Sequence, residues 1–320
     1  MATLVELRLT LWIGAAALFA ACAQSAVPNG RPAAGSSAIA AQGQRGSWML
    51  ADAKHGALLY LSGDRTTYVL SYPAGKLVGQ LDVGGFSLCT DTGGNVFVSE
   101  YDDDEILEYA HGGTTPVATF LVPAHPWGCA VSPVNGDLAV ALSDVPKLYH
   151  GEIEIFPRGT QGQPRTYSDS AIMYFFNCVY DDQGDLFVDG TPSQHTFFAE
   201  MPANAQSFTN IGVDGPVYQD SALAWDGAHV VFADGLRHVI DIMSIDGNAG
   251  KIASAVRLKD WHRSNGKEVW INGSTVIAMP GAHLGAAVWK YPGGGQPIRR
   301  LAYFLKRMQL FGVAVSRAQQ

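Results

Sequence analysis

From Trp48 onward the chain alternates short apolar segments with clusters of glycine and polar residues, and it lacks the longer period of an amphipathic helix. The segment Trp127–Val131 is apolar, Asn135-Gly136 follows as a turn signal, and Leu138–Ala141 is apolar again. An Asn-Gly pair between two apolar runs is typical of a hairpin of two antiparallel strands. The pattern therefore predicts a chain built from short strands and tight turns.

The same hairpin pattern recurs before and after this segment. Phe86–Asp91 leads through a glycine-containing turn into Val96–Glu100, and Phe176–Asp181 leads through another into Leu186–Asp189. Self-similarity at a fixed spacing is the sequence signature of repeat architectures, propellers among them. The recurrence predicts one structural unit repeated along the chain.

A second landmark marks the end of the third strand in each unit, where an apolar residue is often followed by proline. Proline and glycine at such places stop a strand and open a turn. Six sites fit this description, 37 to 47 residues apart: Tyr72-Pro73, Tyr109-Ala110, Phe156-Pro157, Met201-Pro202, Ile245-Asp246 and Tyr291-Pro292. This spacing is that of four-stranded propeller blades, so six ends predict six blades.

The two ends of the domain complement each other. Ser47–Asp52 resembles a second strand that has no first strand before it, and Phe311–Ser316 resembles a first strand with nothing after it. Pairing them would complete one blade and remove two open sheet edges. We therefore expect an all-β, six-bladed β-propeller over residues 47–320, closed by the C-terminal strand beside Trp48–Asp52.

Composition is compatible with this fold and excludes one class of partner. The 320 residues are 47% hydrophobic and 16% charged, and 36 are glycine, as expected for a globular chain rich in turns. A formal net charge of −8 argues against nucleic acid as a partner, because phosphate binding needs clustered Lys and Arg.

The N-terminus has the pattern of an export signal. Residues 1–22 combine Arg8 with an apolar run from Leu9 to Ala21 that is too short for a membrane-spanning helix. Leu18–Cys22 resembles a bacterial lipobox, which predicts lipid attachment at Cys22 as the sole membrane contact. The alternatives are cleavage in Ala21-Cys22-Ala23 with simple secretion, and an uncleaved anchor. Residues 23–46 are small and polar, as in a flexible tether.

Cys89, Cys129 and Cys178 each lie in the first strand of a repeat, among apolar residues. Buried free thiols are the expectation, because cysteine is readily buried, and one disulfide between neighbouring repeats is the alternative. No histidine stands in a recognisable relation to them, so a catalytic thiol is not predicted.

The motif of Leu88–Glu100, followed by Ile106–Tyr109, resembles the NHL-repeat and lactonase-like group of six-bladed β-propellers. In the lactonase branch, Glu, Asn and Asp hold a divalent cation at the channel mouth. The corresponding positions here are Phe86, Trp127, Phe176, Ser221, Lys267 and Phe311. These side chains offer few oxygen ligands, so no cofactor is expected. A register differing by one residue would instead bring Asn177 and Glu268 to the mouth, with Asp220, and only this alternative implies calcium.

The aromatic residues Phe86, Trp127, Phe176 and Phe311 allow two interpretations. They could wedge between blades and plug one end of the channel, or remain exposed as a stacking platform for a sugar or another flat ligand. The loop Glu100–Glu105 lacks the spacing of a calcium loop and is expected to be a solvated acidic loop. Four scattered histidines in or beside equivalent loops lack a metal-binding motif: His55, His195, His238 and His283.

These patterns favour a non-catalytic propeller of the bacterial envelope that binds a protein, a glycan or a small ligand on its loop face. The alternative is a lactonase-like hydrolase with a diverged metal site. Both functions depend on which side chains meet at the channel mouth.

Overall fold

A computed structural model describes residues 46–145, 150–191, 196–215, 217, 221–235, 237–261, 268–280, 285–305 and 308–318. The predicted leader with Cys22, and all of the predicted tether except Gly46, lie outside these ranges. The described part is all-β, with three short 3-10 helices: η1 (Ala51–His55), η2 (Pro157–Gly159) and η3 (Tyr303–Leu305). Within the described ranges, no helix has the length and apolar character needed to cross a membrane.

The strands form five hydrogen-bonded sheets, and each is described in the order in which neighbouring strands pair. The first is β1 (Trp48–Met49), β4 (Leu77–Leu81), β3 (Thr67–Ser71), β2 (Leu58–Gly63) and β25 (Leu310–Ser316). The second is β5 (Ser87–Thr90), β6 (Val96–Glu100), β7 (Glu105–Tyr109) and β8 (Pro116–Leu121). The third is β12 (Arg165–Tyr167), β11 (His150–Phe156), β10 (Leu138–Val145) and β9 (Pro126–Val131).

The fourth sheet has eight strands and consists of two antiparallel halves. One half is β13 (Tyr174–Tyr180), β14 (Leu186–Thr191), β15 (Phe197–Met201) and β16 (Thr209–Asp214). The other is β20 (Ala249–Arg257), β19 (Val239–Asp246), β18 (Val230–Asp234) and β17 (Ser221–Trp225), joined to the first by parallel pairing of β16 with β20. The fifth sheet is β21 (Val269–Asn272), β22 (Thr275–Ala278), β23 (Ala286–Lys290) and β24 (Gly294–Leu301).

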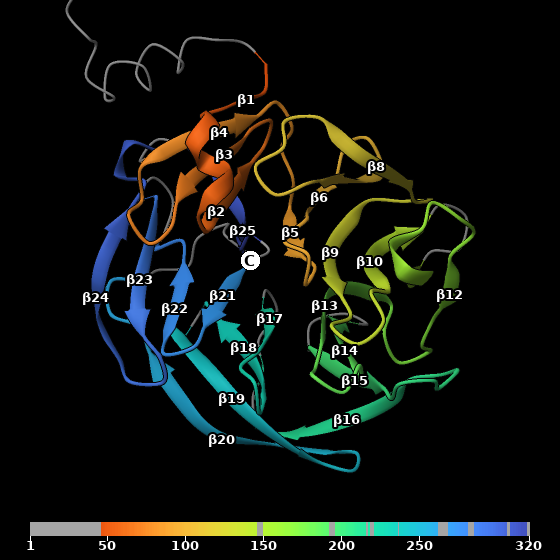
Figure 1. Cartoon of the computed structure of the whole chain (residues 1–320). Coiled ribbons are helices and arrows are strands. Elements are labelled where there is room, and N and C mark those ends of the chain that lie inside the picture. The colour runs from red at the N-terminus through yellow and green to blue at the C-terminus, as the bar shows by residue number, and fades with distance from the viewer. Residues whose placement is uncertain are drawn as a thin grey trace, which may run out of the picture.

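The sheets stand around a central axis, as the blades of a propeller do (Figure 1). The strands nearest the axis are β25, β5, β9, β13, β17 and β21, and each contacts the next around the ring, with β21 contacting β25. Apolar side chains from facing sheets fill the spaces between them; one such cluster contains Leu58, Tyr60, Leu88 and Val98. The arrangement is that of a β-propeller.

The two ends of the domain meet, but not where the sequence pattern predicts. Strand β25 pairs antiparallel with β2, from Leu58 opposite Ser316 to Gly63 opposite Leu310. The expected partner, Trp48–Asp52, is wrong: Trp48 and Met49 pair instead with β4 at the outer edge, and the chain then enters η1. Burial explains the difference, because all of β2 is buried whereas Trp48 and Met49 are only half-buried.

The predicted turns and strand ends lie close to their expected positions. The six predicted ends of third strands fall within one residue of the ends of β3, β7, β11, β15, β19 and β23. Gly94, Gly136 and Gly184 occupy equivalent turns with φ of 85°, 76° and 87°. Glycine recurs there because this left-handed conformation is unfavourable for residues with a Cβ atom.

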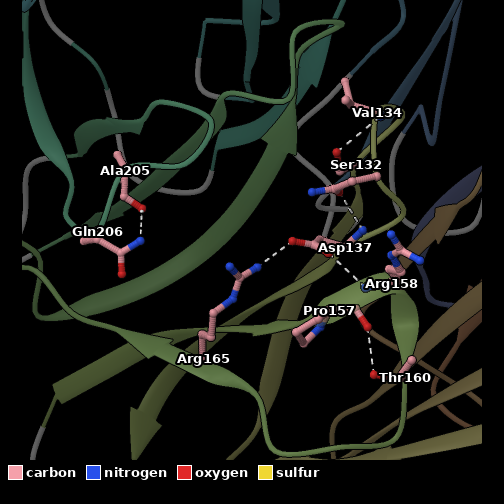
Figure 2. Close-up of polar contacts among 10 residues, drawn as sticks. Ser132, Val134, Asp137, Pro157, Arg158, Thr160, Arg165, Ala205 and Gln206 are labelled. Atoms are coloured by element: carbon pink, nitrogen blue, oxygen red, sulfur yellow. Dashed lines mark hydrogen bonds and ion pairs between the residues drawn. The ribbon is translucent and has the colours of Figure 1, made fainter.

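A turn at the opposite end of the hairpins from the aromatic segments is fastened by Asp137 (Figure 2). Its carboxylate accepts a hydrogen bond of 2.9 Å from the Arg158 backbone N–H and forms an ion pair of 2.5 Å with Arg165 Nη2. Asp137 is buried while Arg165 remains half-exposed. The contact ties the β9–β10 turn to both ends of the β11–β12 connection.

Cys89 and Cys129 form a disulfide with a Cα–Cα distance of 5.8 Å, which joins β5 to β9 in the neighbouring sheet. The expectation of buried free thiols is therefore wrong for these two residues, and the alternative of one disulfide between repeats is confirmed. Cys178 is the buried free cysteine among the described residues. Two cysteines can pair only if their Cα atoms lie close enough together. Here that distance depends on how neighbouring repeats pack, which the sequence pattern does not show.

Candidate functional site

Three of the four predicted aromatic residues lie at irregularities in the innermost hairpins. The register between β9 and β10 shifts around Trp127, that between β13 and β14 around Phe176, and that between β25 and β2 around Phe311. Each ring thus belongs to the extra residue of a β-bulge, a feature that redirects a side chain and often occurs next to functional sites. Phe86 directly precedes β5, and its N–H donates to the Ser99 carbonyl.

The four rings form one continuous arc, here called the aromatic arc. Phe86 stacks on Phe311 with ring centroids 4.6 Å apart. Trp127 lies 5.4 Å from Phe86 and 5.3 Å from Phe176. The arc follows four consecutive innermost strands, β25, β5, β9 and β13, at the end of the channel where these strands begin.

One of the four rings is buried, as expected for a plug of the channel, and the other three are partly exposed, as expected for a stacking platform. Phe311 is only 4% exposed and closes part of the channel end, as a plug would. Phe86, Trp127 and Phe176 are partly exposed, so their rings retain accessible surface. Ser221 has no described side chain and Lys267 lies outside the described residues, so the other two predicted mouth positions remain predictions.

Two aromatic neighbours of the arc escape the sequence pattern. Tyr101, in the loop after β6, lies 4.5 Å from Phe86 and meets Trp127 edge-on at 5.8 Å. His125 stacks on Tyr101 at 4.3 Å and ion-pairs with Asp104 at 3.0 Å. The sequence does mark Tyr101 as the one aromatic residue in the acidic loop. Its contacts with Phe86 and Trp127 cannot be predicted, because they depend on the conformation of that loop.

Below the arc lies an axial cavity of about 180 Å³, lined by all six innermost strands. Glu268, directly before β21, reaches across it and binds two other strands. Its carboxylate accepts hydrogen bonds from the Leu88 N–H at 3.1 Å, from the Val313 N–H at 2.8 Å and from the Ser87 hydroxyl. Ser87 Oγ accepts in turn from the Cys129 N–H at 3.2 Å. One carboxyl group therefore connects β21, β25, β5 and β9.

Burial is the main cause of the pKa shifts of the titratable groups that line this cavity. It raises the pKa of Glu268 to about 8, although the hydrogen bonds from Ser87, Val313 and Leu88 act in the opposite direction. Burial, followed by the negative charges of Asp189 and Glu268, also raises the pKa of the Cys178 thiol far above its ordinary value. Cys178 is therefore a packed thiol and a poor nucleophile.

Asn177 and Glu268 both line the axial cavity, so the alternative register for a metal site has two of its three residues in one place. Their polar atoms are already engaged, however. Asn177 Nδ2 donates to both Asp189 carboxylate oxygens at 3.0 and 3.1 Å, and Glu268 accepts from Ser87, Leu88 and Val313. Asp220 lies outside the described residues.

Calcium prefers six or more oxygen ligands, and the described residues contain no group of three His, Cys, Asp or Glu that could hold a metal ion. The described residues of the axial cavity alone therefore supply fewer oxygen ligands than calcium prefers. Of the four candidate histidines, His55 lies in η1 and His238 between β18 and β19, while His195 and His283 lie outside the described ranges.

The acidic loop after β6 is only partly solvated. Asp102 and Asp103 are exposed, as expected, but Glu100 is half-buried next to Tyr101. Burial is the main cause that raises the pKa of Glu100 to about 7, and the neighbouring charges of Asp103, Asp102 and Glu105 add to it. The loop thus places a carboxyl group beside the aromatic arc.

No protein-family model matches the chain, and no relative is found among curated proteins. Solved structures do match in shape. A protein of unknown function from Bacteroides caccae has a TM-score of 0.60 at 13% identity, over 82% of this chain and 99% of that one. A chain of a nidogen/laminin complex has a TM-score of 0.65 at 12% identity, over 83% and 100%.

A third similar structure, a functionally unknown protein from Desulfotomaculum acetoxidans, has a TM-score of 0.57 at 10% identity, over 82% of this chain and 99% of that one. At such identities the likeness concerns the fold alone. The fold and these neighbours define the chain as a β-propeller protein.

Proposed function

We propose that the protein is an exported, non-catalytic β-propeller that binds a ligand at the aromatic arc. The single observation that carries this proposal is the partial exposure of Phe86, Trp127 and Phe176 around one channel end, two of them on β-bulges. Plugging a channel requires apolar volume, whereas Phe86, Trp127 and Phe176 remain partly exposed next to carboxylates. Flat apolar rings flanked by polar groups are what small-molecule and sugar sites use. A glycan or another small, flat ligand suits this surface.

The finer description of the fold belongs to the same proposal. Counting the two halves of the eight-stranded sheet separately gives six units around the axis, in keeping with a six-bladed propeller of the NHL-repeat and lactonase-like group. The pairing of β25 with β2 would then close the ring.

Export is supported by the disulfide, since such bonds persist in oxidising compartments outside the bacterial cytosol. We propose residues 1–22 as the signal peptide and Cys22 as the lipid-bearing residue, with simple secretion as the other outcome. Intact mass of the mature protein, compared with a Cys22→Ala variant, separates the two. A diacylglyceryl mass lost in the variant indicates a lipoprotein.

Binding at the arc is tested by screening neutral oligosaccharides and aromatic fragments by isothermal titration calorimetry. Trp127→Ala is expected to weaken any hit at least about tenfold, because the ring supplies stacking area. The matched control is Phe197→Ala, which removes an exposed ring on β15, outside the arc. Equal weakening by both variants, or no ligand for the wild type, contradicts the proposal.

The second candidate is a lactonase-like hydrolase, favoured by the presence of Asn177 and Glu268 in one cavity. It predicts calcium-dependent hydrolysis of lactones that Glu268→Gln and Asn177→Ala both abolish. Turnover equal to background, with and without added calcium, leaves the binding proposal as the better account.

A further inference from the structure

A second cavity, here called the mouth cavity, opens beside the aromatic arc and has a volume of about 340 Å³. Three separate segments form most of it: the β2–β3 loop, the residues before β5 and the acidic loop after β6. Its lining residues are Gly63, Asp64, Arg65, Gly85, Phe86, Glu100, Tyr101, Asp102 and Phe311. A flat ligand could stack on the exposed rings without entering the mouth cavity. The residues that line the cavity are therefore independent evidence for the class of ligand.

Part of the lining of the mouth cavity is aromatic. Phe86 contacts Tyr101 at a ring-centroid distance of 4.5 Å and stacks on Phe311 at 4.6 Å, so three rings form an aromatic wall. Tyr101 also stacks on His125, and Phe86 and Tyr101 both remain partly exposed. Rings held in place on a cavity wall present a preformed surface and lose little conformational entropy on binding.

The rest of the lining of the mouth cavity is mostly acidic. Asp64 and Asp102 contribute two carboxyl groups and Arg65 one guanidinium, while Glu100, with its pKa raised to about 7, is only partly charged at neutral pH. The negative potential extends to the aromatic wall: besides burial, the charges of Asp102, Asp104 and Asp144 raise the pKa of Tyr101. An anionic ligand would be repelled here, and a neutral one would gain nothing from the carboxylates beyond hydrogen bonds.

Partly exposed aromatic rings beside carboxylates form a site that suits an organic cation. The quadrupole of an aromatic ring attracts ammonium groups, and nearby carboxylates add Coulombic attraction. A bare metal ion would find no ligands on the aromatic wall. We propose that the mouth cavity binds the ammonium or quaternary ammonium group of a small organic cation. This inference rests on the proposed ligand-binding function and names the ligand class.

The test uses choline chloride and its uncharged isostere 3,3-dimethylbutan-1-ol, titrated into the wild-type protein by calorimetry at constant ionic strength. The two probes have nearly the same shape and differ in charge. Choline is expected to bind at least about tenfold more tightly, from the combined size of cation–π and Coulombic attraction. Equal binding of both probes, or binding of neither, overturns the inference.

Variants then locate the site. Tyr101→Leu is expected to weaken choline binding about three- to thirtyfold, from the size of cation–π interactions. Asp102→Asn is expected to weaken it as well, and Arg65→Ala to tighten it, because one removes an attraction and the other a repulsion. Weaker binding in Arg65→Ala overturns the inference. Denaturation curves matching the wild type confirm that each variant is folded.

The outcomes separate this inference from the proposed function. Neutral sugars that bind in a Trp127-dependent manner, together with absence of choline binding, refute the cation site and leave the arc as a binding surface. Absence of any ligand for both surfaces refutes both proposals.

Discussion

Replacing Glu268 with glutamine tests whether one buried carboxyl group ties the ring together. Glu268 accepts hydrogen bonds from β5 and β25 across the axial cavity, and burial raises its pKa to about 8. At neutral pH the folded protein therefore holds this group mainly protonated, and glutamine is its closest uncharged isostere. The substitution keeps the shape and one acceptor oxygen, replaces the other oxygen with an NH2 group that faces a backbone N–H, and removes the titration.

The sign and size of the effect follow from proton linkage. The pKa in the folded state is about 8, whereas 4.5 is the ordinary value. Between these two pH values the folded state binds more protons than the unfolded chain, so stability is highest below 4.5 and falls as the pH rises to 8. At about 1.36 kcal/mol per pKa unit, the loss across this window is at most about 5 kcal/mol.

The assay is urea denaturation followed by tryptophan fluorescence at several pH values from about 4 to about 9, which bracket the window of linkage. Glu100 and Glu154 also have pKa values raised to about 7 by burial, so the wild-type curve alone contains several contributions. The difference between Glu268→Gln and wild type isolates one group. We expect the variant to be less stable than the wild type at the acidic end, by about 1 to 3 kcal/mol for the acceptor that it loses. This deficit should shrink or reverse toward the alkaline end, where charging Glu268 destabilises only the wild type.

The control for this experiment is Asp182→Asn, which removes an exposed carboxylate from the β13–β14 turn and should leave the slope of stability against pH unchanged. Parallel wild-type and Glu268→Gln curves across the whole range would refute the argument. So would a deficit of the variant that grows toward the alkaline end, since that result would show that the charged form of Glu268 stabilises the fold.

Three further predictions concern stability and use the same denaturation assay. Replacing Cys89 and Cys129 together with serine should lower the free energy of unfolding by about 4 kcal/mol, from the loop of 40 residues that the disulfide closes, and reductant should leave the double variant unaffected. Asp137→Ala should cost about 1 to 3 kcal/mol, because the partly buried hydrogen bond from the Arg158 backbone N–H loses its charged acceptor; wild-type stability would contradict a structural role for the contact in Figure 2. Phe311→Ala should cost about 3 to 5 kcal/mol as a buried ring, against less than about 1 kcal/mol for the exposed Phe197→Ala, and equal losses would refute the plug role.

The sequence pattern predicts the strands well because local chemistry fixes them. Glycine at positive φ in equivalent turns, as at Gly136, and proline after third strands, as at Pro157, act within a few residues. The pattern assigns Trp48–Asp52 as the partner of the C-terminal strand because this segment has the local sequence of an inner strand. Leu58–Gly63 takes that place instead because it is more completely buried, and burial in the folded ring cannot be read from the local sequence.

The candidate site divides in the same way. The aromatic positions, such as Trp127, can be found from their fixed offset to the turn, and Glu268 from a shift of one residue. Tyr101 and Glu100 cannot, because they reach the arc only through the fold of a loop. The sequence supports the disulfide only as an alternative, since the distance between β5 and β9 depends on the packing of neighbouring sheets.

The parallel pairing of β16 with β20 has a consequence for contacts between molecules. A free sheet edge can pair with a strand of another molecule. Here the edges of β16 and β20 pair with each other, and β1 pairs with the edge of β4. In the described part of the chain the remaining outer borders are β1, β8, β12 and β24. Pro116 opens β8, and Arg299 and Arg300 lie on β24, residue types that discourage strand addition. Strand addition by a second molecule in concentrated solution should therefore be disfavoured along β8 and β24 and at the β16–β20 pairing.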